Sequence, residues 1–474
     1  MSATKSIVES GDAFPCHCII AHPDKPKFLV IRHTDRWAPP ILQVPGEGAL
    51  MYKPATINDG MMQKYNLRTT VLRIVMEASN YALVELELHA SSKREMQAVW
   101  VGLEEYAQFR RSEGGDSDPL EQWLRDRERD TVSSRRPPWL HRGWYREAES
   151  WMSNQLLKHG IQTTGSVQQF KAGWPSACLL NVATLQGDVF FKATYDKAPG
   201  EARLTQMLAE HWPDLVVKPL AVAQGRNWML SRDFKMKGDN RPPVDSYTEF
   251  AQSMGKFQVE AMDRLDDWRE MGCAVMDHGY LINDDGRLEQ LLGQVEPQLR
   301  EDPMPFGPQE LGHLRDAIAA AGDASRALSD FEIPDSLTHL DFRPDNFFLE
   351  DGKCRVMDWA DVAISHPFMM LCQTLDFFES YKTGERQSLN VQPVEETQKG
   401  AMEAAYLSAF SDLLPEDKLL DAFEQARAVF PLFWFLYLAS QACIIEARTP
   451  QWNNINSLLK KKAMRLIERH GGEA

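Results

Sequence analysis

The sequence lacks an uninterrupted apolar run of the ~18–20 residues that a membrane-spanning helix needs. Its most apolar stretch, residues 430–447, contains Pro431, Gln441 and Glu446, and is predicted to be a buried helix. The N-terminus lacks the basic, apolar and small residues of a secretory signal. Seven cysteines scattered along 474 residues do not form the pattern of a disulfide framework. We therefore expect a cytoplasmic protein with no membrane partner.

The sequence also has fewer basic than acidic residues. The chain has 52 Lys and Arg against 68 Asp and Glu, which gives a net charge of −16. A protein that binds many nucleic-acid phosphates would have the opposite balance, so no nucleic-acid partner is expected. Residues 1–143 are balanced in charge, so the whole excess lies beyond them. It either keeps the protein soluble or attracts a cation, such as magnesium or an amine-bearing substrate.

The composition changes along the chain in a way that predicts several parts. We expect a small α+β domain at 1–111, a Pro-rich and charged linker at 112–138, a strand-rich lobe at 139–236 and a helical lobe at 237–474. The fold class is therefore α+β. Apolar periodicity predicts strands at 18–21, 27–32, 69–76, 81–89, 176–185, 188–194, 216–222 and 227–231, and helices at 105–111, 119–129, 144–158, 201–211, 247–269, 308–328, 367–381, 395–413, 416–446 and 454–469. The strands at 176–185 and 188–194 are expected to form a hairpin closed by Gln186-Gly187.

One segment, residues 336–360, concentrates the polar groups that catalysis needs. It contains His339-x-Asp341-x-x-x-x-Asn346, and Asp358 follows after two short apolar runs joined by a turn. Such a hairpin brings these side chains together. Phosphoryl transfer needs a carboxylate that orients the acceptor hydroxyl and takes its proton, and a carboxylate and an amide oxygen that hold magnesium. Asp341, Asp358 and Asn346 match those needs, although a solvated acidic loop is the simpler alternative.

The same segment resembles a known family. HLDFRPDNFFL followed by VMDW is similar to the catalytic and metal-binding segments of the aminoglycoside phosphotransferase and choline kinase-like family, which shares the protein kinase fold. The resemblance covers roughly residues 140–470 and implies a strand-rich N-lobe, a helical C-lobe, and ATP and Mg²⁺ as cofactors. It also implies that Asp341 is the catalytic base, that Asn346 and Asp358 bind magnesium, and that His339 and Arg343 support the loop.

The resemblance assigns roles in the strand-rich lobe as well. Lys192 is the one lysine of an apolar strand, and an unpaired buried ammonium is costly. The family pattern implies that Lys192 holds the ATP phosphates and pairs with Glu201, with Glu210 as second choice. It further implies that Leu230 and Arg232 lie in the link between the lobes and contact the nucleotide. The alternative for Lys192 is an edge-strand lysine whose amine reaches solvent.

Three features depart from the family pattern. No Gly-x-Gly-x-x-Gly loop precedes Lys192, and residues 173–177 are the only candidate turn. Met370 stands where many relatives have an aspartate after the Asp-Trp pair, a change expected to affect support of the loop. Arg343 replaces a common histidine, and protein kinases often carry a lysine at that point.

The first domain faintly resembles the opening of a Nudix hydrolase through residues 28–48. That family follows the glycine with a helix rich in metal-binding glutamates, but residues 49–66 contain one Asp and no Glu. We therefore expect a packing or substrate-shaping domain instead of a hydrolase. Cys16-x-Cys18 with His17 and His22 lacks a second ligand pair, so core thiols are favoured over a zinc site.

The predicted function is an ATP-dependent phosphotransferase that acts on a hydroxyl of a small-molecule acceptor. The alternative from another class is a pseudokinase-like nucleotide-binding module. A protein kinase is disfavoured because no Ala-Pro-Glu segment follows Asp358. Asp376 and Glu379, on a predicted helix, are guesses for an amine-binding face, and a solvated helix face explains them equally well. The acceptor, the choice between ATP and GTP, and the oligomeric state stay open.

Overall fold

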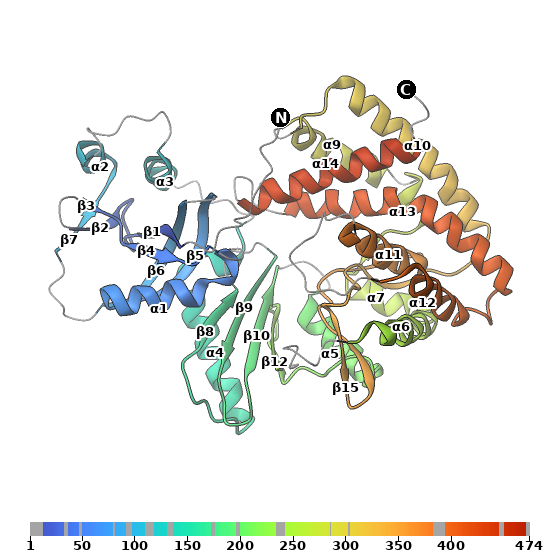
Figure 1. The fold of residues 1–474 in the computed structure, drawn as a ribbon, viewed down its shortest axis with the longest axis horizontal. Coiled ribbons are helices and arrows are strands. Elements are labelled where there is room, and N and C mark those ends of the chain that lie inside the picture. Colours follow the sequence, from blue (N-terminus) through green and yellow to red (C-terminus); the bar gives the residue numbers. More distant parts are fainter. Residues whose placement is uncertain are drawn as a thin grey trace. The chain divides into compact units, whose positions relative to one another are not determined.

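The computed structural model describes residues 13–32, 37–46, 50–78, 81–91, 97–109, 118–129, 136–171, 176–195, 200–233, 242–284, 286–301, 304–382, 394–444 and 450–470. The chain forms two compact units (Figure 1). One comprises Met1–Tyr195 and Ile445–Asn453, and the other comprises Asp196–Ile444 and Asn454–Ala474. The predicted α+β class, strand-rich first and helical later, is confirmed. The division between units falls within the predicted strand-rich lobe, and the domain borders at 111, 138 and 236 stay predictions.

The N-terminal unit contains a four-stranded sheet in the order β4-β1-β6-β5 and a three-stranded sheet in the order β3-β2-β7. In the first sheet, β1 is parallel to β6, and the other neighbours are antiparallel. The elements are β1 (Phe14–Ile20), β2 (Phe28–Arg32), β3 (Trp37–Ala38), β4 (Ile41–Val44), η1 (Leu50–Tyr52), α1 (Pro54–Tyr65), β5 (Leu67–Ala78), β6 (Tyr81–Ser91), β7 (Ala98–Val101), α2 (Leu103–Phe109) and α3 (Pro119–Glu128).

The same unit continues with the strands that the sequence predicted as a hairpin. After η2 (Pro138–Leu140) come α4 (Trp144–Lys158), β8 (Gln168–Lys171), β9 (Ala177–Val182) and β10 (Val189–Thr194). β9 pairs with β10 and with β8, antiparallel in both cases. Figure 1 shows these three strands side by side with α4 along them. Lys192 lies on β10, as predicted.

The second unit is mainly helical around short strand pairs. β14 and β17 are antiparallel, β13 lies on the other side of β17, and β15 and β16 form a separate hairpin. The strands are β11 (Ala221–Val222), β12 (Trp228–Arg232), β13 (Ala274–Val275), β14 (Ser336–His339), β15 (Phe347–Glu350), β16 (Lys353–Val356) and β17 (Val362–Ser365). The helices are α5 (Glu201–His211), η4 (Val244–Ser246), α6 (Tyr247–Met262), α7 (Leu265–Glu270), α8 (His278–Leu281), α9 (Arg287–Leu299), α10 (Pro308–Ser329), α11 (Phe368–Lys382), α12 (Glu396–Ser408), α13 (Glu416–Ile444) and α14 (Pro450–His470).

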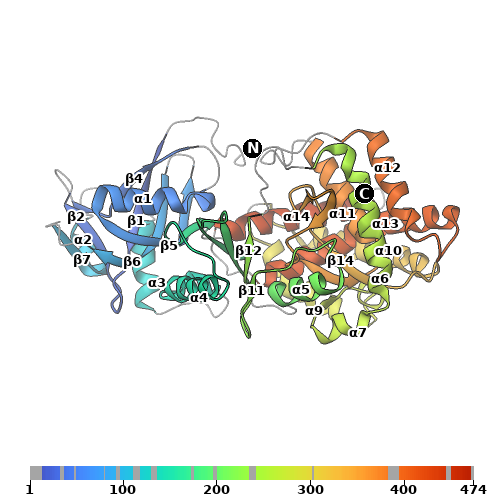
Figure 2. The ribbon, with the colours of Figure 1, turned by 90° about the horizontal axis from the view of Figure 1, so that it is seen from below.

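The long helix α13 forms the centre of this unit's core. It packs against α9, α10, α11 and α12, and lies beside α14 (Figure 2). Among the described residues, it alone is long and apolar enough to cross a membrane, and 61% of its most apolar window is buried inside the protein. Burial of that extent is what a core helix shows, which agrees with the prediction for residues 430–444; the predicted end at 445–447 lies outside the described residues.

Local sequence explains several element ends. α3 begins at Pro119 because the Asp118 carboxylate accepts a hydrogen bond from the Leu120 amide (2.8 Å), and proline suits the first helical position. α5 follows Gly200, whose φ of 76° favours glycine. A Cβ at Gly200 would lie 2.8 Å from the Asn227 side-chain oxygen, so the close approach also requires glycine.

Some predicted elements were wrong in extent. Residues 216–222 are not one strand, because only Ala221 and Val222 form β11 and Val216 makes an isolated bridge to Val356. The predicted helix 247–269 breaks into α6 and α7. α1, α8, α9 and the short strands β3, β4 and β7 were not predicted. The glycine-poor turn at residues 173–177 lies mostly outside the described residues.

Candidate active site

Two antiparallel strands hold the ends of the candidate catalytic loop. β14 leads into the loop and β17 follows Asp358, with His339 opposite Val362. The Leu340 amide also donates to the Asp361 carbonyl oxygen (2.8 Å), which extends this pairing by one step. The β15–β16 hairpin between them turns at Asp351 and Gly352, both with positive φ. The predicted hairpin therefore brings the catalytic loop and the Asp358 segment to one place.

Both ring nitrogens of His339 form hydrogen bonds with backbone atoms of this segment. Its side chain is fully buried, and its Nδ1 accepts a hydrogen bond from the Asp341 amide (3.1 Å). Its Nε2 lies 3.1 Å from the Met357 carbonyl oxygen, which assigns the proton to Nε2. The imidazole thus ties Asp341 to the residue that precedes Asp358. The supporting role of His339 in catalysis stays a prediction.

Asn346 fixes the carboxylate of Asp341. Its Nδ2 donates to Asp341 Oδ2 (2.8 Å) and to the Asp341 carbonyl oxygen (2.8 Å). The Asn346 carbonyl oxygen accepts from the Met357 amide at 2.8 Å, so Asn346 is itself tied to the Asp358 segment. Because the side-chain NH₂ is used as a donor toward Asp341, the amide oxygen is the atom left to meet a cation.

Arg343 lies beside the same carboxylate. Its Nε is 3.3 Å from Asp341 Oδ1 and 3.9 Å from Asp345 Oδ2, and its guanidinium carbon is 5.9 Å from the Phe377 ring centroid. The Asp341 and Arg343 side chains are 24% and 25% exposed, so both reach solvent. The site therefore combines an accessible carboxylate with an adjacent permanent positive charge.

Asp358 adopts a backbone conformation that is unusual for its residue type. Its φ is 63°, in the left-handed region that costs a non-glycine residue about 1–2 kcal/mol. The next residue, Trp359, is fully buried, donates from Nε1 to the Val356 carbonyl oxygen (3.2 Å), and has its ring 4.8 Å from that of His339. Trp359 packing is thus in a position to hold Asp358 in this conformation.

The surroundings of Asp341 shift the pKa of its carboxyl group. The pKa of Asp341 is raised to about 7, mainly because its carboxyl group is poorly solvated. Arg343 and Asn346 lower this pKa, whereas the nearby carboxylates of Asp358 and Asp361 add to the increase. A carboxylate that titrates near neutral pH suits a group that takes up and releases a proton. Perturbation of this kind is common at functional sites.

Sequence reasoning missed three residues that shape this site. Asp361 lies within electrostatic range of Asp341, and Tyr437 of α13 forms a hydrogen bond with Asp361. The Thr374 hydroxyl of α11 lies 2.8 Å from the Phe342 carbonyl oxygen and 3.0 Å from that of Met370. Thr374 therefore supports the loop from the helix on which Met370 stands. The Asp-Trp-x-Asp pattern could have drawn attention to Asp361, but no sequence signal marks Tyr437 or Thr374.

The donor set fits magnesium. Asp358 and Asn346 offer carboxylate and amide oxygens, which Mg²⁺ prefers, and Mg²⁺ typically takes only one or two protein ligands beside phosphates and water. In the part of the chain that the structure describes, no group of three or more His, Cys, Asp or Glu residues could hold a metal on its own. Cys16 and Cys18 are buried free thiols of β1.

The predicted nucleotide residues lie in different units. Lys192 is half-buried on β10 of the N-terminal unit. Glu201 is the first residue of α5 in the second unit and is 4% exposed. Leu230 is fully buried in β12, where its carbonyl oxygen accepts from the Leu220 amide (2.8 Å), and Arg232 is exposed at the end of that strand. Their nucleotide roles, and the Lys192–Glu201 pair, stay predictions.

The guessed acceptor residues already have partners. Asp376 of α11 is 2.8 Å from Lys462 Nζ and 3.2 Å from Arg465 Nη1, both on α14. Glu379 forms an ion pair with Lys399 of α12. An amine at either carboxylate would therefore compete with these cations, and the acceptor-binding role stays a prediction.

In the predicted first domain, a helix follows residues 28–48, but it carries few acidic residues. α1 carries Asp59 as its single acidic residue and no glutamate. Its buried residues are Pro54, Ile57 and Met61, of which Ile57 and Met61 belong to the apolar core of the four-stranded sheet. The helix thus packs the domain and lacks the glutamates with which Nudix hydrolases bind metal.

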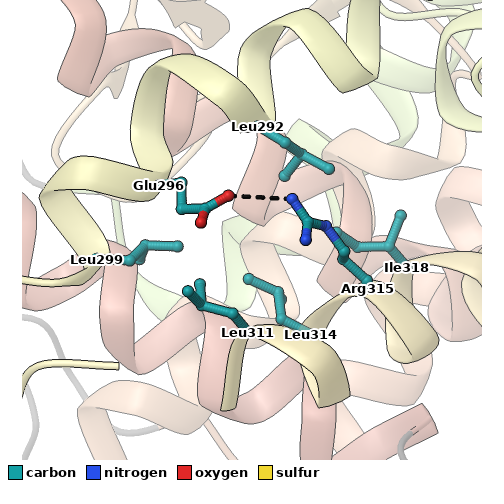
Figure 3. A pocket seen from close by; sticks show the side chains of 7 residues that line it. All are labelled: Leu292, Glu296, Leu299, Leu311, Leu314, Arg315 and Ile318. Atoms are coloured by element: carbon teal, nitrogen blue, oxygen red, sulfur yellow. Dashed lines mark hydrogen bonds and ion pairs between the residues drawn. The ribbon is translucent and has the colours of Figure 1, made fainter. Parts of the chain in front are cut away.

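A separate pocket lies between α9 and α10 (Figure 3). Leucine and isoleucine side chains line it, and Glu296 forms an ion pair with Arg315 across it at 3.0 Å. The seven lining residues are Leu292, Glu296, Leu299, Leu311, Leu314, Arg315 and Ile318. None of them belongs to the catalytic loop, so this pocket is a packing feature between two helices.

Comparison with known proteins gives distant structural neighbours only. No protein-family model matches the sequence, and no curated protein matches it. A Plasmodium vivax ethanolamine kinase is 11% identical with a TM-score of 0.45, over 74% of this chain and 96% of its own. A Cryptosporidium parvum choline kinase is 14% identical with a TM-score of 0.44, over 70% of this chain and 94% of its own. A putative aminoglycoside phosphotransferase from Ralstonia eutropha is 14% identical with a TM-score of 0.40, over 69% and 98%.

These neighbours are small-molecule kinases by their names, and none of the three is named as a Nudix hydrolase. At such low identity and TM-score, function has to be argued from the geometry of the site itself.

Proposed function

We propose that this chain is an ATP- and Mg²⁺-dependent small-molecule kinase. It would transfer the γ-phosphate of ATP to a hydroxyl group of a small acceptor. The observation that carries the proposal is the pair of 2.8 Å hydrogen bonds from Asn346 Nδ2 to the carboxylate and carbonyl of Asp341. These bonds fix the Asp341 carboxylate and leave the Asn346 amide oxygen available to a cation, which supports the roles that phosphoryl transfer requires.

In this proposal Asp341 acts on the acceptor, and the other residues act on the phosphates. Asp341 orients the acceptor hydroxyl and accepts its proton as the oxygen forms a bond to the γ-phosphorus. The bond from that phosphorus to the bridging oxygen breaks, and ADP leaves with the electron pair. Asn346 and Asp358 would hold magnesium, which neutralises charge on the phosphates when bound. Lys192 would bind the phosphates by its positive charge.

A cationic acceptor fits the charge around this centre. Asp358 and Asp361 both lie within electrostatic range of Asp341, and Tyr437 forms a hydrogen bond with Asp361. Arg343 provides a positive charge at 3.3 Å from Asp341, which leaves a surplus of negative charge among these four side chains. An amine or ammonium group on the acceptor would offset the part of that negative charge that magnesium leaves uncompensated. Asp376 and Glu379, already paired with lysine and arginine side chains, are weaker candidates for this contact.

The test is a phosphate-transfer assay with the full chain. We would incubate it with γ-labelled Mg-ATP and choline, ethanolamine, kanamycin or hygromycin B as hydroxyl-bearing probes, and would follow label transfer with and without EDTA. Transfer that EDTA abolishes supports the proposal. Mg-ATP binding without transfer to any hydroxylated probe or metabolite supports the pseudokinase-like alternative, and the absence of both binding and transfer refutes the kinase assignment.

A further inference from the structure

The side chain of Gln169 joins two sheets of the N-terminal unit. Gln169 lies in β8, the outermost strand of its sheet, and is 5% exposed. Its Oε1 accepts a hydrogen bond from the Val71 amide (2.7 Å), and its Nε2 donates to the Val71 carbonyl oxygen (2.9 Å). Val71 belongs to β5, which is also an edge strand. The carboxamide therefore offers Val71 the donor and acceptor that an additional strand would offer.

A helix of the first domain strengthens this junction. Asn58 of α1 donates from Nδ2 to Gln169 Oε1 (2.9 Å), so that oxygen accepts two hydrogen bonds. The Asn58 side-chain oxygen Oδ1 accepts a hydrogen bond from the Thr69 hydroxyl (3.4 Å), which ties Asn58 back to β5. β8 is thus held by side-chain and backbone groups of two separate elements, and loss of Gln169 would leave buried backbone groups of Val71 unpaired.

A second route connects the first domain to β10. The Gly143 amide, just before α4, donates to Glu87 of β6 at 2.9 Å. On α4, the rings of Trp144 and Trp151 meet the Phe191 ring edge-to-face, with centroids 5.9 and 5.8 Å away. Phe191 is fully buried and directly precedes Lys192. Because side chains alternate along a strand, Lys192 extends from the opposite face of β10.

From these contacts we propose that Gln169 is a positioning residue. Through Gln169, the first domain holds the sheet strands β8, β9 and β10 in place, and β10 carries Lys192. The idea rests on the proposed function for the role of Lys192 at the phosphates. The first domain is then a structural part of the nucleotide-binding strands, which gives it a role without hydrolytic chemistry. Since phosphate binding depends on a precisely placed ammonium group, a loosened β10 would bind Mg-ATP more weakly.

The test uses Gln169→Leu in the full chain, because leucine keeps most of the volume and removes both donor and acceptor. Hydrogen exchange of the β9 and β10 amides should be roughly ten- to a hundredfold faster than in the wild type, as expected for loss of buried hydrogen bonds. The Kd for Mg-ATP should rise about tenfold, while kcat at saturating Mg-ATP stays within about threefold. Gln169→Glu keeps the acceptor oxygens and should have an intermediate effect, as should Asn58→Ala.

Trp123→Phe is the matched control. It removes the hydrogen bond from Trp123 to Glu85 (3.1 Å) in the same domain but in a different core cluster from Val71. It should lower the melting temperature and leave exchange in β10 and Mg-ATP affinity unchanged. Unchanged β10 exchange in Gln169→Leu, or equal acceleration in Trp123→Phe, would overturn the inference. If the wild type binds no Mg-ATP, the proposed function fails, and the exchange data still decide whether Gln169 braces β10.

Discussion

At the scale of single residues, the candidate catalytic loop is held by hydrogen bonds to backbone atoms within the loop and at Met357. His339 and Asn346 both contact the segment that leads to Asp358, through the Met357 carbonyl and amide groups. Asn346 also reaches the carboxylate of Asp341. A substitution at Asp341 can therefore remove the proton acceptor while the loop keeps most of its support.

Asp341→Asn tests the proposed base. Asparagine keeps the shape of aspartate but cannot accept the acceptor proton at neutral pH. We expect kcat to fall by about 10²–10⁴-fold, the usual cost of losing a general base, with Mg-ATP affinity nearly unchanged. Steady-state phosphate transfer and calorimetric titration with Mg-ATP measure the two effects. Turnover within a few-fold of wild type would refute Asp341 as the base.

Asp358→Ala tests the proposed metal ligand. Removing a carboxylate ligand should weaken Mg²⁺-dependent nucleotide binding, since phosphate charge is then less well compensated. The thermal shift caused by Mg-ATP should shrink in this variant, while Asp412→Ala, at an exposed position of the same unit, should retain it. Equal stabilisation of Asp358→Ala and wild type by Mg-ATP would argue against a metal-binding role.

At the scale of elements, helices of the second unit pack closely against one another and against β14, the strand that precedes the candidate catalytic loop. α6 and α12 meet at Gly255, where an added Cβ would lie 2.7 Å from the Tyr406 carbonyl oxygen and 2.9 Å from Ala409 Cβ. The Tyr406 hydroxyl contacts the Pro367 carbonyl oxygen (2.8 Å) at the start of α11. The spacing of α6 and α12 therefore affects the position of α11, whose Thr374 hydroxyl contacts the candidate catalytic loop.

Gly255→Ala should destabilise the protein by about 1–3 kcal/mol, because the backbone of α12 must move to admit the methyl group. Gly312→Ala is the control on α10, where nothing lies within 4 Å of the added Cβ and the helix position is exposed. That change should stabilise by up to about 1 kcal/mol, since alanine favours helix over glycine. Chemical denaturation measures both free energies, and equal effects of the two substitutions would contradict the close contact.

At the scale of the whole molecule, the uneven charge offers a test of the acceptor. The net charge of −16 arises beyond residue 143. If part of it faces the acceptor, a cationic acceptor should bind more weakly as salt rises, because the Debye length shrinks from ~10 Å at 0.1 M to ~3 Å at 1 M. The KM of the acceptor, measured across that range, reports the effect. A KM that is flat or falls with salt would eliminate the cationic acceptor and leave the kinase proposal untouched.

Removing the first domain tests how far the remaining chain depends on it. The sequence led us to expect that a chain starting near Arg135 would still bind ATP. Such a chain lacks Val71, Asn58 and Glu87, the partners of Gln169 and of the α4 start. We therefore expect a lower melting temperature and faster proteolysis than in the full chain. A melting temperature equal to that of the full chain would show that these contacts contribute little to stability.

The sequence by itself determined the structural features that depend on residues close together in the chain. Apolar periodicity predicted Trp144–Lys158 as a helix and β9–β10 as a hairpin, because both patterns repeat over short distances. Likewise, the spacing of His339, Asn346 and Asp358 around a turn sufficed to predict that their segments meet. α1 escaped prediction because proline, glycine and asparagine interrupt its weak pattern, and its helical state depends on burying Ile57 and Met61.

Only the tertiary structure decided the partners of these segments. Tyr437 reaches Asp361 from α13, Thr374 reaches the loop from α11, and Gln169 reaches Val71 from another sheet. Asp376 and Glu379, which could be read as an open acidic face, prove to be paired with basic side chains of α14 and α12. Such contacts join residues far apart in the chain, and their formation depends on how whole elements pack, which local composition does not specify.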